Sequence, residues 1–559
     1  MIFCIKNNIN YIKMRKTSLF LLFLGYSISL FAQQVTEKPV LNVSSRNNVD
    51  AYSVKYDKPT GSYIYTDYDT TTRKNTIMTS QGSAGPYDYA ASYDALFDAQ
   101  GNVYTYTYNN ITDTTFNYFL LKNNQVAASY TMINYGWAIK NGIIYYSAVD
   151  NGHASLYQYN TADGTIKKGK EYDTITFVSY PQAPSEGEAT GTIGFTNDGK
   201  VYYMASSNNE KFMVIGDEEQ KHYSDIDYYN VRMDPSGNLT YIARDMGKFY
   251  DTKGNTFVVQ GTKEYKKYDY VYGPVIFDKN NNAVYYASDS VSGKFMCKVV
   301  SGNSEIKTFE GNVYSMQMTP GGKLAYVMSY PAAPDQVYKS AIVVDGKQYK
   351  SYENMGIITF PGNDIPMYSA GSTDKSLLYN GDEAISERYQ SIVDGRILPN
   401  GKLEYVGVNY GNYDRKQSDK YYLHMGDDKF GPFNTINMID YTNSSYVLAD
   451  NSGNYAFVGS KLKDWKSYTM EQTLYTNKGK SPVFDYIDFV KLYNGKPFYI
   501  GTTTTDRKNN INKQRIYYDN KPATPDYDSI ANYNFDDATG TFSFIGAKGS
   551  QLYYVEVKL

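Results

Sequence analysis

One short pattern recurs along almost the whole chain: a turn residue, then alternating apolar and aromatic positions, then a small residue. After the turn, usually a glycine, two or three positions lead to an aromatic residue, most often tyrosine. Alternation with a period of two is typical of a half-buried β-strand, and glycine accepts the positive φ of a tight turn. The turn residues of the copies are Gly61, Gly101, Gly142, Gly199, Gly237, Asn282, Gly322, Asp364, Gly401, Gly453, Gly495 and Gly540.

The spacing of these copies indicates one repeated structural unit. The eleven steps from Gly61 to Gly540 cover 479 residues, or about 43.5 residues per step, and a blade of four short strands takes roughly 40–45 residues. We therefore predict an all-β fold, a β-propeller of about twelve four-stranded blade-like repeats. In nine copies a small residue follows the aromatic residue by two positions, on the same strand face. We attribute it to a strand that narrows toward a crowded axis. These small residues are Ala148, Ala205, Ala243, Ser288, Ala370, Gly407, Gly459, Gly501 and Gly546.

A second apolar strand follows each copy and ends in a turn, as in Phe212–Asp217 and Ala341–Lys347. The turns before the copies often contain the dipeptides Asp-Gly, Ser-Gly or Gly-Gly, which are typical of β-hairpin turns. Together these features resemble the TolB-type and WD-type propeller repeats of secreted bacterial proteins, over roughly residues 50–559. The resemblance implies a propeller fold far more than a function. The chain lacks the Trp-Asp dipeptide of the WD type and the Ser-x-Asp-x-Gly-x-Thr-Trp box of sialidase-like propellers.

The number of copies bears on domain organisation. A propeller ring usually has roughly four to eight blades, so we expect two consecutive propellers, residues 33–310 and 311–559. A seven-plus-five division and an open solenoid remain alternatives. The last copy, from Gly540 to Leu559, has room for about two strands. Segment 35–58 could supply the missing ones and close a ring.

The N-terminus has the pattern of a secretory signal peptide, residues 1–32. Arg15 and Lys16 precede an apolar run that ends near Ala32, after which we expect cleavage, and residues 1–13 look like an upstream extension before Met14. We therefore expect an exported protein, periplasmic or extracellular. No later apolar stretch approaches the ~18 residues of a transmembrane segment, so we expect none. Cys297 is the only cysteine after the signal, and we expect a small buried apolar residue there.

Composition narrows the function classes. The formal net charge is −3 and both signs are dispersed, so we expect no nucleic-acid partner. The 63 tyrosines make the chain tyrosine-rich, and we assign most of them to strand faces.

No residue pattern indicates catalysis, a metal or a cofactor, so we name no catalytic residue, no metal ligand and no cofactor, and the binding residues are unknown. His153, His222 and His424 stand in different repeats without ligand spacing, and we expect surface or strand-face histidines. Asp67, Asp69, Asp536 and Asp537 suggest turns, because the calcium-loop spacing is missing.

Three features could serve binding. Trp137 and Trp465 are the only tryptophans, and the polar, basic loop 502–515 is longer than a hairpin needs. Core filling is the alternative for Trp137, and a solvated loop the alternative for 502–515. An Asp-Ser/Thr tripeptide resembles the O-glycosylation acceptor that some bacteria use on exported proteins, although chance in an Asp- and Thr-rich chain is the alternative. It occurs at Asp69, Asp113, Asp173, Asp289 and Asp528.

We therefore expect a non-enzymatic exported binding or scaffold protein. Its propeller faces would engage a protein partner of the cell envelope, with a glycan as the other possible ligand. The alternative is a secreted or periplasmic hydrolase of glycans or peptides, with carboxylates converging in a propeller channel. A structural surface protein that self-assembles is a third possibility.

Overall fold

The computed structural model describes residues 34–43, 51–134, 136–178, 193–246, 255–332, 338–372, 374–412, 416–440, 445–506 and 511–559. The predicted signal peptide, with its upstream extension, lies outside them. In the described part the chain forms 52 β-strands and one 3-10 turn, η1 (Ser92–Asp94). No helix there has the length and apolar character of a membrane span. The strands form twelve antiparallel sheets, which confirms the all-β propeller fold and the predicted number of blades.

Backbone contacts divide the chain into two compact units. One is Lys55–Thr435, and the other is Ile436–Leu559 together with the segment before Lys55. We number the sheets as blades in chain order, with blades 1–9 in the first unit and blades 10–12 in the second. The division into propellers 33–310 and 311–559 stays a prediction; residue 310 ends β28 and closes blade 6.

In the first unit, blades 1, 5, 6, 7, 8 and 9 have four consecutive strands, and the first strand of blades 2, 3 and 4 is interrupted. The strands of blades 1–4 are β2 (Lys55–Tyr56), β3 (Tyr63–Asp69), β4 (Lys74–Thr79), β5 (Gly82–Tyr87); β6 (Tyr89–Ala90), β7 (Leu96–Phe97), β8 (Val103–Asn110), β9 (Phe116–Lys122), β10 (Gln125–Tyr130); β11 (Met132–Ile133), β12 (Ala138–Lys140), β13 (Ile143–Asp150), β14 (His153–Asn160), β15 (Ile166–Tyr172); and β16 (Thr174–Thr176), β17 (Gly194–Phe195), β18 (Val201–Ser207), β19 (Glu210–Ile215), β20 (Glu218–Glu219). Those of blades 5–9 are β21 (Asp225–Met233), β22 (Leu239–Arg244), β23 (Thr256–Gln260), β24 (Lys263–Glu264); β25 (Tyr270–Phe277), β26 (Ala283–Val291), β27 (Lys294–Ser301), β28 (Ser304–Glu310); β29 (Asn312–Met318), β30 (Leu324–Pro331), β31 (Tyr338–Val344), β32 (Lys347–Gln348); β33 (Asn354–Thr359), β34 (Met367–Ser372), β35 (Lys375–Asn380), β36 (Glu383–Ala384); and β37 (Ser391–Ile397), β38 (Leu403–Asn409), β39 (Lys420–Met425), β40 (Asp428–Phe433).

In the second unit, blade 10 has an interrupted first strand, and blade 12 combines strands from both ends of the chain. The strands of blades 10–12 are β41 (Thr435–Asn437), β42 (Val447–Ala449), β43 (Tyr455–Asp464), β44 (Thr469–Thr476), β45 (Gly479–Lys480); β46 (Tyr486–Tyr493), β47 (Lys496–Asp506), β48 (Ile511–Tyr518), β49 (Lys521–Pro522); and β50 (Ser529–Asp536), β51 (Thr541–Lys548), β52 (Gln551–Lys558), β1 (Gln34–Asn42).

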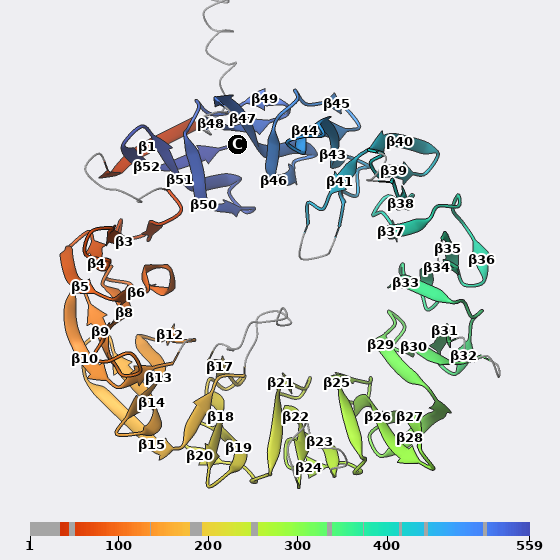
Figure 1. Ribbon diagram of the computed structural model, residues 1–559, viewed down its shortest axis with the longest axis horizontal. Helices are drawn as coiled ribbons and strands as arrows, with labels where there is room; N and C mark the ends of the chain where they lie inside the picture. The colour runs from red at the N-terminus through yellow and green to blue at the C-terminus, as the bar shows by residue number, and fades with distance from the viewer. Residues whose placement is uncertain are drawn as a thin grey trace, which may run out of the picture. The chain divides into compact units, whose positions relative to one another are not determined.

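The blades of the first unit share one orientation. In Figure 1, blades 5–9 follow one another along a curve with β21, β25, β29, β33 and β37 on its concave side. Their fourth strands, such as the two-residue β24 and the seven-residue β28, lie on the convex side. After the two-residue strands β24, β32 and β36, the linkers 265–269, 349–353 and 385–390 lead to the first strand of the next blade.

The sequence repeat coincides with the second strand of every blade, and its glycine forms the turn before that strand. Gly237 and Gly401, for example, have φ of +86° and +81°. In blade 6 the predicted register is wrong by one residue. Asn281, not Asn282, takes the left-handed conformation, with φ of +60°, and the repeat tyrosine is therefore Tyr285.

The small residue of the repeat has a different cause from the predicted narrowing strand. In blades 9, 11 and 12 it lies beneath an aromatic residue of the preceding linker, which packs on the second strand. A Cβ atom added at Gly407 would lie 2.3 Å from the ring of Tyr389, and one at Gly501 would lie 2.5 Å from the ring of Phe484. The prediction was wrong because the crowding group belongs to another segment of the chain.

Blade 12 is completed by one strand of the expected segment 35–58, β1, whereas β2 of the same segment belongs to blade 1. β1 pairs antiparallel with β52, from Gln34 opposite Lys558 to Asn42 opposite Gln551. Glu37 of β1 accepts hydrogen bonds from the Tyr527 hydroxyl and from Lys548 Nζ, the latter at 2.5 Å. Residues 34–42, which begin two positions after Ala32, are thus part of the fold.

Candidate binding surface

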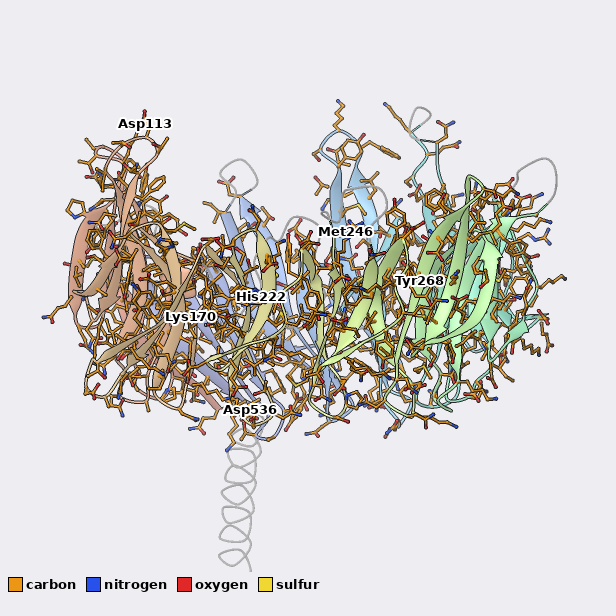
Figure 2. The ribbon with its side chains drawn as sticks, turned by 90° about the horizontal axis from the view of Figure 1, so that it is seen from below. Asp113, Lys170, His222, Met246, Tyr268 and Asp536 are labelled. Carbon is orange, nitrogen blue, oxygen red and sulfur yellow. The ribbon has the colours of Figure 1, made fainter. Side chains whose placement is uncertain are left out.

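Blade 2 carries a row of aromatic side chains that continues beyond its core. Tyr104 and Tyr106 of β8 are buried in the cluster shared with blade 3. Tyr108 points to the same side of the strand because side chains alternate along it, but it is only half-buried. The row leaves the core because β8 and β9 extend past the packed part of the sheet. Figure 2 shows Asp113 at the tip of this hairpin, clear of the neighbouring strands of the unit.

Tyr108 is the centre of a preassembled aromatic group. Its ring stacks on Tyr89 at 5.0 Å and 14°, and it contacts Tyr118 at 4.8 Å and Phe116 at 5.3 Å, all between ring centroids. The Tyr89 and Tyr93 hydroxyls share a hydrogen bond of 2.5 Å. We call this group, with Ile111, the aromatic hairpin. Tyr93 is 64% exposed, and Ile111, 68% exposed, lies in the turn between β8 and β9, so apolar side chains here are open to a partner.

Sequence reasoning missed the aromatic hairpin, although its alternating pattern was available. Tyrosine stands at every second position from Tyr104 to Tyr108, and the partner strand begins with Phe116 and Tyr118. The repeat explained only one aromatic position per copy.

Trp137 lies at the edge of the same core. Its indole Nε1–H donates a hydrogen bond of 3.0 Å to the Asp94 carbonyl, and its ring meets Tyr106 edge-on at 5.7 Å. The side chain is half-buried. Trp137 therefore supports the base of the aromatic hairpin rather than forming a separate anchor.

Trp465 and the loop 502–515 both belong to long hairpins of the second unit. Trp465 is half-buried at the tip between β43 and β44, 6.2 Å from the ring of the exposed Tyr468. The loop 502–515 mostly continues β47 and β48, with residues 507–510 outside the described part. Lys513 and Arg515 form ion pairs with Asp528 at 2.5 Å and Asp526 at 2.8 Å, which reduces the positive charge available to an anionic partner.

The three histidines lie on different blades, 3, 4 and 9. His222 stacks on Phe212 at 3.9 Å, and its Nδ1 lies 3.1 Å from Glu210 Oε2. His424 is buried, with Nε2 2.6 Å from the Tyr389 hydroxyl, and burial lowers its pKa. His153 is exposed at the start of β14. Within the described ranges, no group of three or more His, Cys, Asp or Glu side chains could hold a metal ion.

Cys297 and Glu404 are a buried thiol and a buried carboxyl group whose pKa values are raised. Burial raises the pKa of the Cys297 thiol to about 11, in agreement with the predicted apolar role. Glu404 is fully buried, and burial together with Asp394 raises its pKa to about 8. Arg396 Nε donates to its Oε2 at 3.1 Å, and its Oε1 accepts no hydrogen bond from the described residues. Sequence reasoning missed Glu404, which occupies a strand position that is apolar, Ser or Thr in the other copies.

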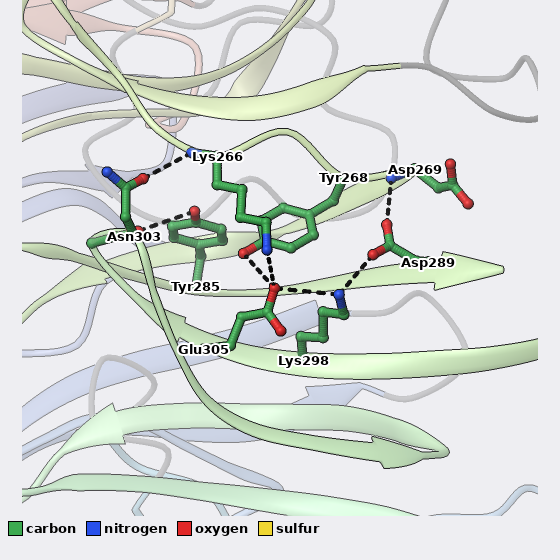
Figure 3. A network of polar contacts seen from close by, with 9 residues as sticks. Lys266, Tyr268, Asp269, Tyr285, Asp289, Lys298, Asn303 and Glu305 are labelled. Carbon is green, nitrogen blue, oxygen red and sulfur yellow. Dashed lines mark hydrogen bonds and ion pairs between the residues drawn. The ribbon is translucent and has the colours of Figure 1, made fainter. Parts of the chain in front are cut away.

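A network of ion pairs and hydrogen bonds connects the linker between blades 5 and 6 to the outer strands of blade 6, and Figure 3 shows it. Lys266 Nζ lies 2.6 Å from Glu305 Oε1, and the Tyr268 hydroxyl donates to the same oxygen at 3.4 Å. Lys298 bridges Glu305 at 3.3 Å and Asp289 at 2.8 Å. The ion pair with Lys266 holds the pKa of Glu305 below its usual value. These groups are mutually satisfied, which indicates a structural role.

The Asp-Ser/Thr tripeptides fall into two structural classes. Asp173, Asp289 and Asp528 stabilise the blades; Asp173 accepts a hydrogen bond of 2.8 Å from the Asn208 amide, for example. Asp69 closes a hairpin turn by accepting from the Thr71 amide at 2.8 Å, and Asp113 lies at the tip of the aromatic hairpin. O-glycosylation stays a prediction for the exposed threonines that follow them.

Three clefts in the first unit bear on the hydrolase hypothesis. One of about 690 Å³ has Arg232 and apolar side chains such as Phe277 in its wall, and no carboxylate. A second of about 310 Å³ has a single carboxylate, Asp198. A third of about 350 Å³, between blades 8 and 9, has no charged residue in its wall. None of the three combines the two carboxylates that glycoside hydrolysis requires.

Comparison with known proteins identifies no family: no family model matches the chain, and no curated protein matches it. Among solved structures it is similar to a eukaryotic initiation factor, with 10% identity, a TM-score of 0.33, and coverage of 67% of this chain and 94% of that one. The chain is also similar to the β-propeller domain of the Trilobed protease from Pyrococcus furiosus, with 12% identity and a TM-score of 0.25. The match covers 52% of this chain and 95% of that one. For TolB from Acinetobacter baumannii the identity is 13% and the TM-score 0.21, and the match covers 58% of this chain and 80% of that one. At these values the likenesses carry no functional argument.

Proposed function

We propose that this chain is an exported, non-enzymatic binding or scaffold protein that engages a protein partner of the cell envelope through the aromatic hairpin of blade 2. The observation that carries the proposal is the aromatic row that leaves the core and reaches the exposed Tyr93 through Tyr89, with the exposed Ile111 in the turn of the hairpin. A propeller fold is compatible with protein binding but does not specify it.

The chemistry of the aromatic hairpin favours a protein partner. Interface energy concentrates in a few large aromatic anchors surrounded by groups that exclude water. The rings of Tyr89, Tyr108, Phe116 and Tyr118 already pack on one another, so little side-chain entropy is lost when a partner covers them. Tyr93 and Ile111 would then be the residues that lose the most solvent contact.

The hydrolase alternative finds less support. Its carboxylates would have to converge in an accessible cleft, and the walls of the three clefts provide at most one carboxylate each. Glu404 has the raised pKa of a general acid, but it is fully buried.

Export is supported by the signal-peptide pattern and by the position of β1. The strand begins at Gln34, so cleavage after Ala32 would leave blade 12 complete. N-terminal sequencing of the protein recovered from outside the cytoplasm would yield Gln33 as the first residue. A protein that keeps residues 1–32 and stays in the cytoplasm would contradict the export proposal.

Affinity capture from envelope fractions tests the partner surface. The wild-type chain should retain a specific protein, and Tyr108→Ala or Tyr93→Ala should weaken that interaction by about 10-fold or more, as expected for an anchor residue. Tyr338→Ala is the matched control, because Tyr338 is 56% exposed on blade 7. Equal retention by all variants with unchanged thermal unfolding would refute a role for the hairpin.

A further inference from the structure

The cleft between blades 8 and 9 is lined by neutral polar groups. Its wall contains Asn354, Ser369, Ser376, Gln390 and Ser391, and no Asp, Glu, Lys or Arg. With a volume of about 350 Å³, it falls in the range of small-molecule sites. We call it the blade 8–9 cleft.

The cleft exists because side chains that fill the corresponding space in blade 6 are missing here. Two and four residues after the linker tyrosine, blade 6 has Tyr270 and Tyr272, whose rings stack at 6.2 Å. Blade 8 has Asn354 and Gly356 at these positions. A Cβ atom at Gly356 would lie 3.0 Å from Ser369 Oγ, so even a small side chain would narrow the space.

Several hydrogen-bonding groups of the cleft have no partner among the residues that the structure describes. These are the side-chain amide of Asn354, the Nε2 of Gln390 and the hydroxyls of Ser369, Ser376 and Ser391. Ser369 is 3% exposed and lines the cleft, so a ligand there can replace water as the hydrogen-bond partner of its hydroxyl. A ligand with several donors and acceptors would satisfy them together.

Tyr410 adds a flat apolar surface at the edge of the cleft. Its side chain is 54% exposed, and its backbone amide donates to Gln390 Oε1, which fixes the tyrosine beside the polar groups. Met355 and Ile392 supply further apolar contact. An aromatic face next to hydroxyl and amide groups matches a ligand that is polar at its edges and apolar on its faces.

We infer that the blade 8–9 cleft binds a neutral carbohydrate, one or two sugar units at a time. Sugar hydroxyls both donate and accept, as do the serine hydroxyls and carboxamides of the cleft. A charged sugar would bind less tightly, because its charged group would lose water in a cleft whose lining residues carry no opposite charge. A peptide offers only one backbone donor and acceptor per ~3.3 Å of extended chain, too sparse for five groups in so small a cleft. The site and its ligand class are separate from the protein partner proposed above.

Saturation-transfer NMR and titration calorimetry on the full mature chain test this inference. The probes are neutral disaccharides of gluco, galacto and manno configuration, an N-acetylglucosamine dimer, a disaccharide with one uronic acid, and a capped Ala-Ser-Gly peptide. We expect saturable binding of at least one neutral sugar with a dissociation constant on the order of 1 mM, in keeping with the small buried area. The uronic acid analogue should bind at least about 10-fold more weakly.

Variants connect this binding to the cleft. Tyr410→Ala and Gly356→Val should each weaken binding about 10-fold or more, and Ser391→Ala by about 3-fold. Tyr338→Ala, equally exposed on blade 7, should leave sugar binding unchanged. Three results would overturn the inference. They are no saturable binding of any neutral sugar, sugar binding by Tyr410→Ala and Ser391→Ala as strong as by wild type, and stronger binding of the peptide than of any neutral sugar. Capture of the protein partner should be the same in Tyr410→Ala as in wild type, so failure of either proposal is recognised separately.

Discussion

Blades 6 and 9 are built on the same packing unit. In each, the linker tyrosine lies edge-on against the repeat tyrosine of the second strand. The ring centroids are 6.4 Å apart for Tyr268 and Tyr285 and 6.5 Å apart for Tyr389 and Tyr405. The interplanar angles are 70° and 62°. The two blades therefore share the same aromatic pair in nearly the same geometry.

The groups around this pair differ in polarity. Blade 6 places Val284 before its repeat tyrosine, and Val300 pairs with Tyr285 across the sheet. Blade 9 has Glu404 and His424 at the same positions. All four residues are buried. Blade 9 thus has two titratable side chains where blade 6 has two valines.

The outer ion pair is reversed as well. In blade 6 the linker provides Lys266 and the outer strand provides Glu305; in blade 9 the linker provides Glu387 and the outer strand provides Lys429, also at 2.6 Å. Each charged residue of the outer strand follows the turn glycine by three positions. The comparison teaches that the aromatic packing defines the blade junction, whereas the order of the charges is free as long as they are opposite.

The largest expected effect concerns the space beneath the linker tyrosine. Gly407→Val should lower the free energy of unfolding by about 3 kcal/mol or more, because the new side chain must displace the Tyr389 ring. Ala287→Val in blade 6 should cost less, about 1–2 kcal/mol, because a Cβ atom is already accommodated there. Urea denaturation of both variants measures the difference. A Gly407→Val chain as stable as wild type would show that Tyr389 is free to move.

The next effect is the pH dependence that comes from the buried carboxyl group of Glu404, which blade 6 replaces with Val284. The folded-state pKa of Glu404 is raised to about 8, so the folded chain retains a proton that the unfolded chain releases near pH 4.5. The contribution of Glu404 to stability should therefore fall as pH rises from about 4.5 to 8. Glu404→Gln should remove this loss and be more stable than wild type by on the order of 2–3 kcal/mol at pH 9. Near pH 5 the difference should be small.

Thermal unfolding of wild type and Glu404→Gln across this pH range measures the effect. Val284→Leu in blade 6 is the control and should shift stability equally at every pH. Parallel pH profiles of wild type and Glu404→Gln would contradict a protonated Glu404.

Removing the linker hydroxyl should distinguish the two blades more modestly. Tyr389→Phe leaves His424 Nε2 without its partner at 2.6 Å, which should cost about 1–2 kcal/mol. Tyr268→Phe loses only the 3.4 Å contact with Glu305 and should cost about 0.5 kcal/mol. Denaturation midpoints of the two variants provide the measurement, and equal losses would count against a role for His424.

The smallest effect is that of charge order. Glu387→Lys alone should cost about 0.5–1 kcal/mol, and adding Lys429→Glu should restore most of it, because exposed pairs contribute little and depend only on opposite sign. In blade 6, Lys266→Glu combined with Glu305→Lys should restore less of the lost stability, because Lys298 also forms an ion pair with Glu305. Double-mutant cycles at low and high salt test both cases. A blade 9 exchange that recovers nothing would show that charge order matters.

The sequence was sufficient for the architecture within each blade. Strand alternation and the turn glycine are local, so the second strands around Tyr241 and Tyr405 and their number could be predicted. The length of the last copy even indicated that an N-terminal strand would complete blade 12. The predictions about export, the division near residue 310 and glycosylation concern features that the fold does not test.

Tertiary structure alone decided what lies between blades. The cause of the small residue at Gly407 is a ring from a linker eighteen residues earlier in the chain, and the burial of Glu404 depends on packing around its strand. The aromatic hairpin is a surface only because its strands extend past their neighbours, and the blade 8–9 cleft exists because Gly356 leaves space that Tyr272 fills in blade 6. Periodicity predicts which side of a strand a residue faces, but not which segment of the chain covers that side, because the covering groups come from elsewhere in the sequence.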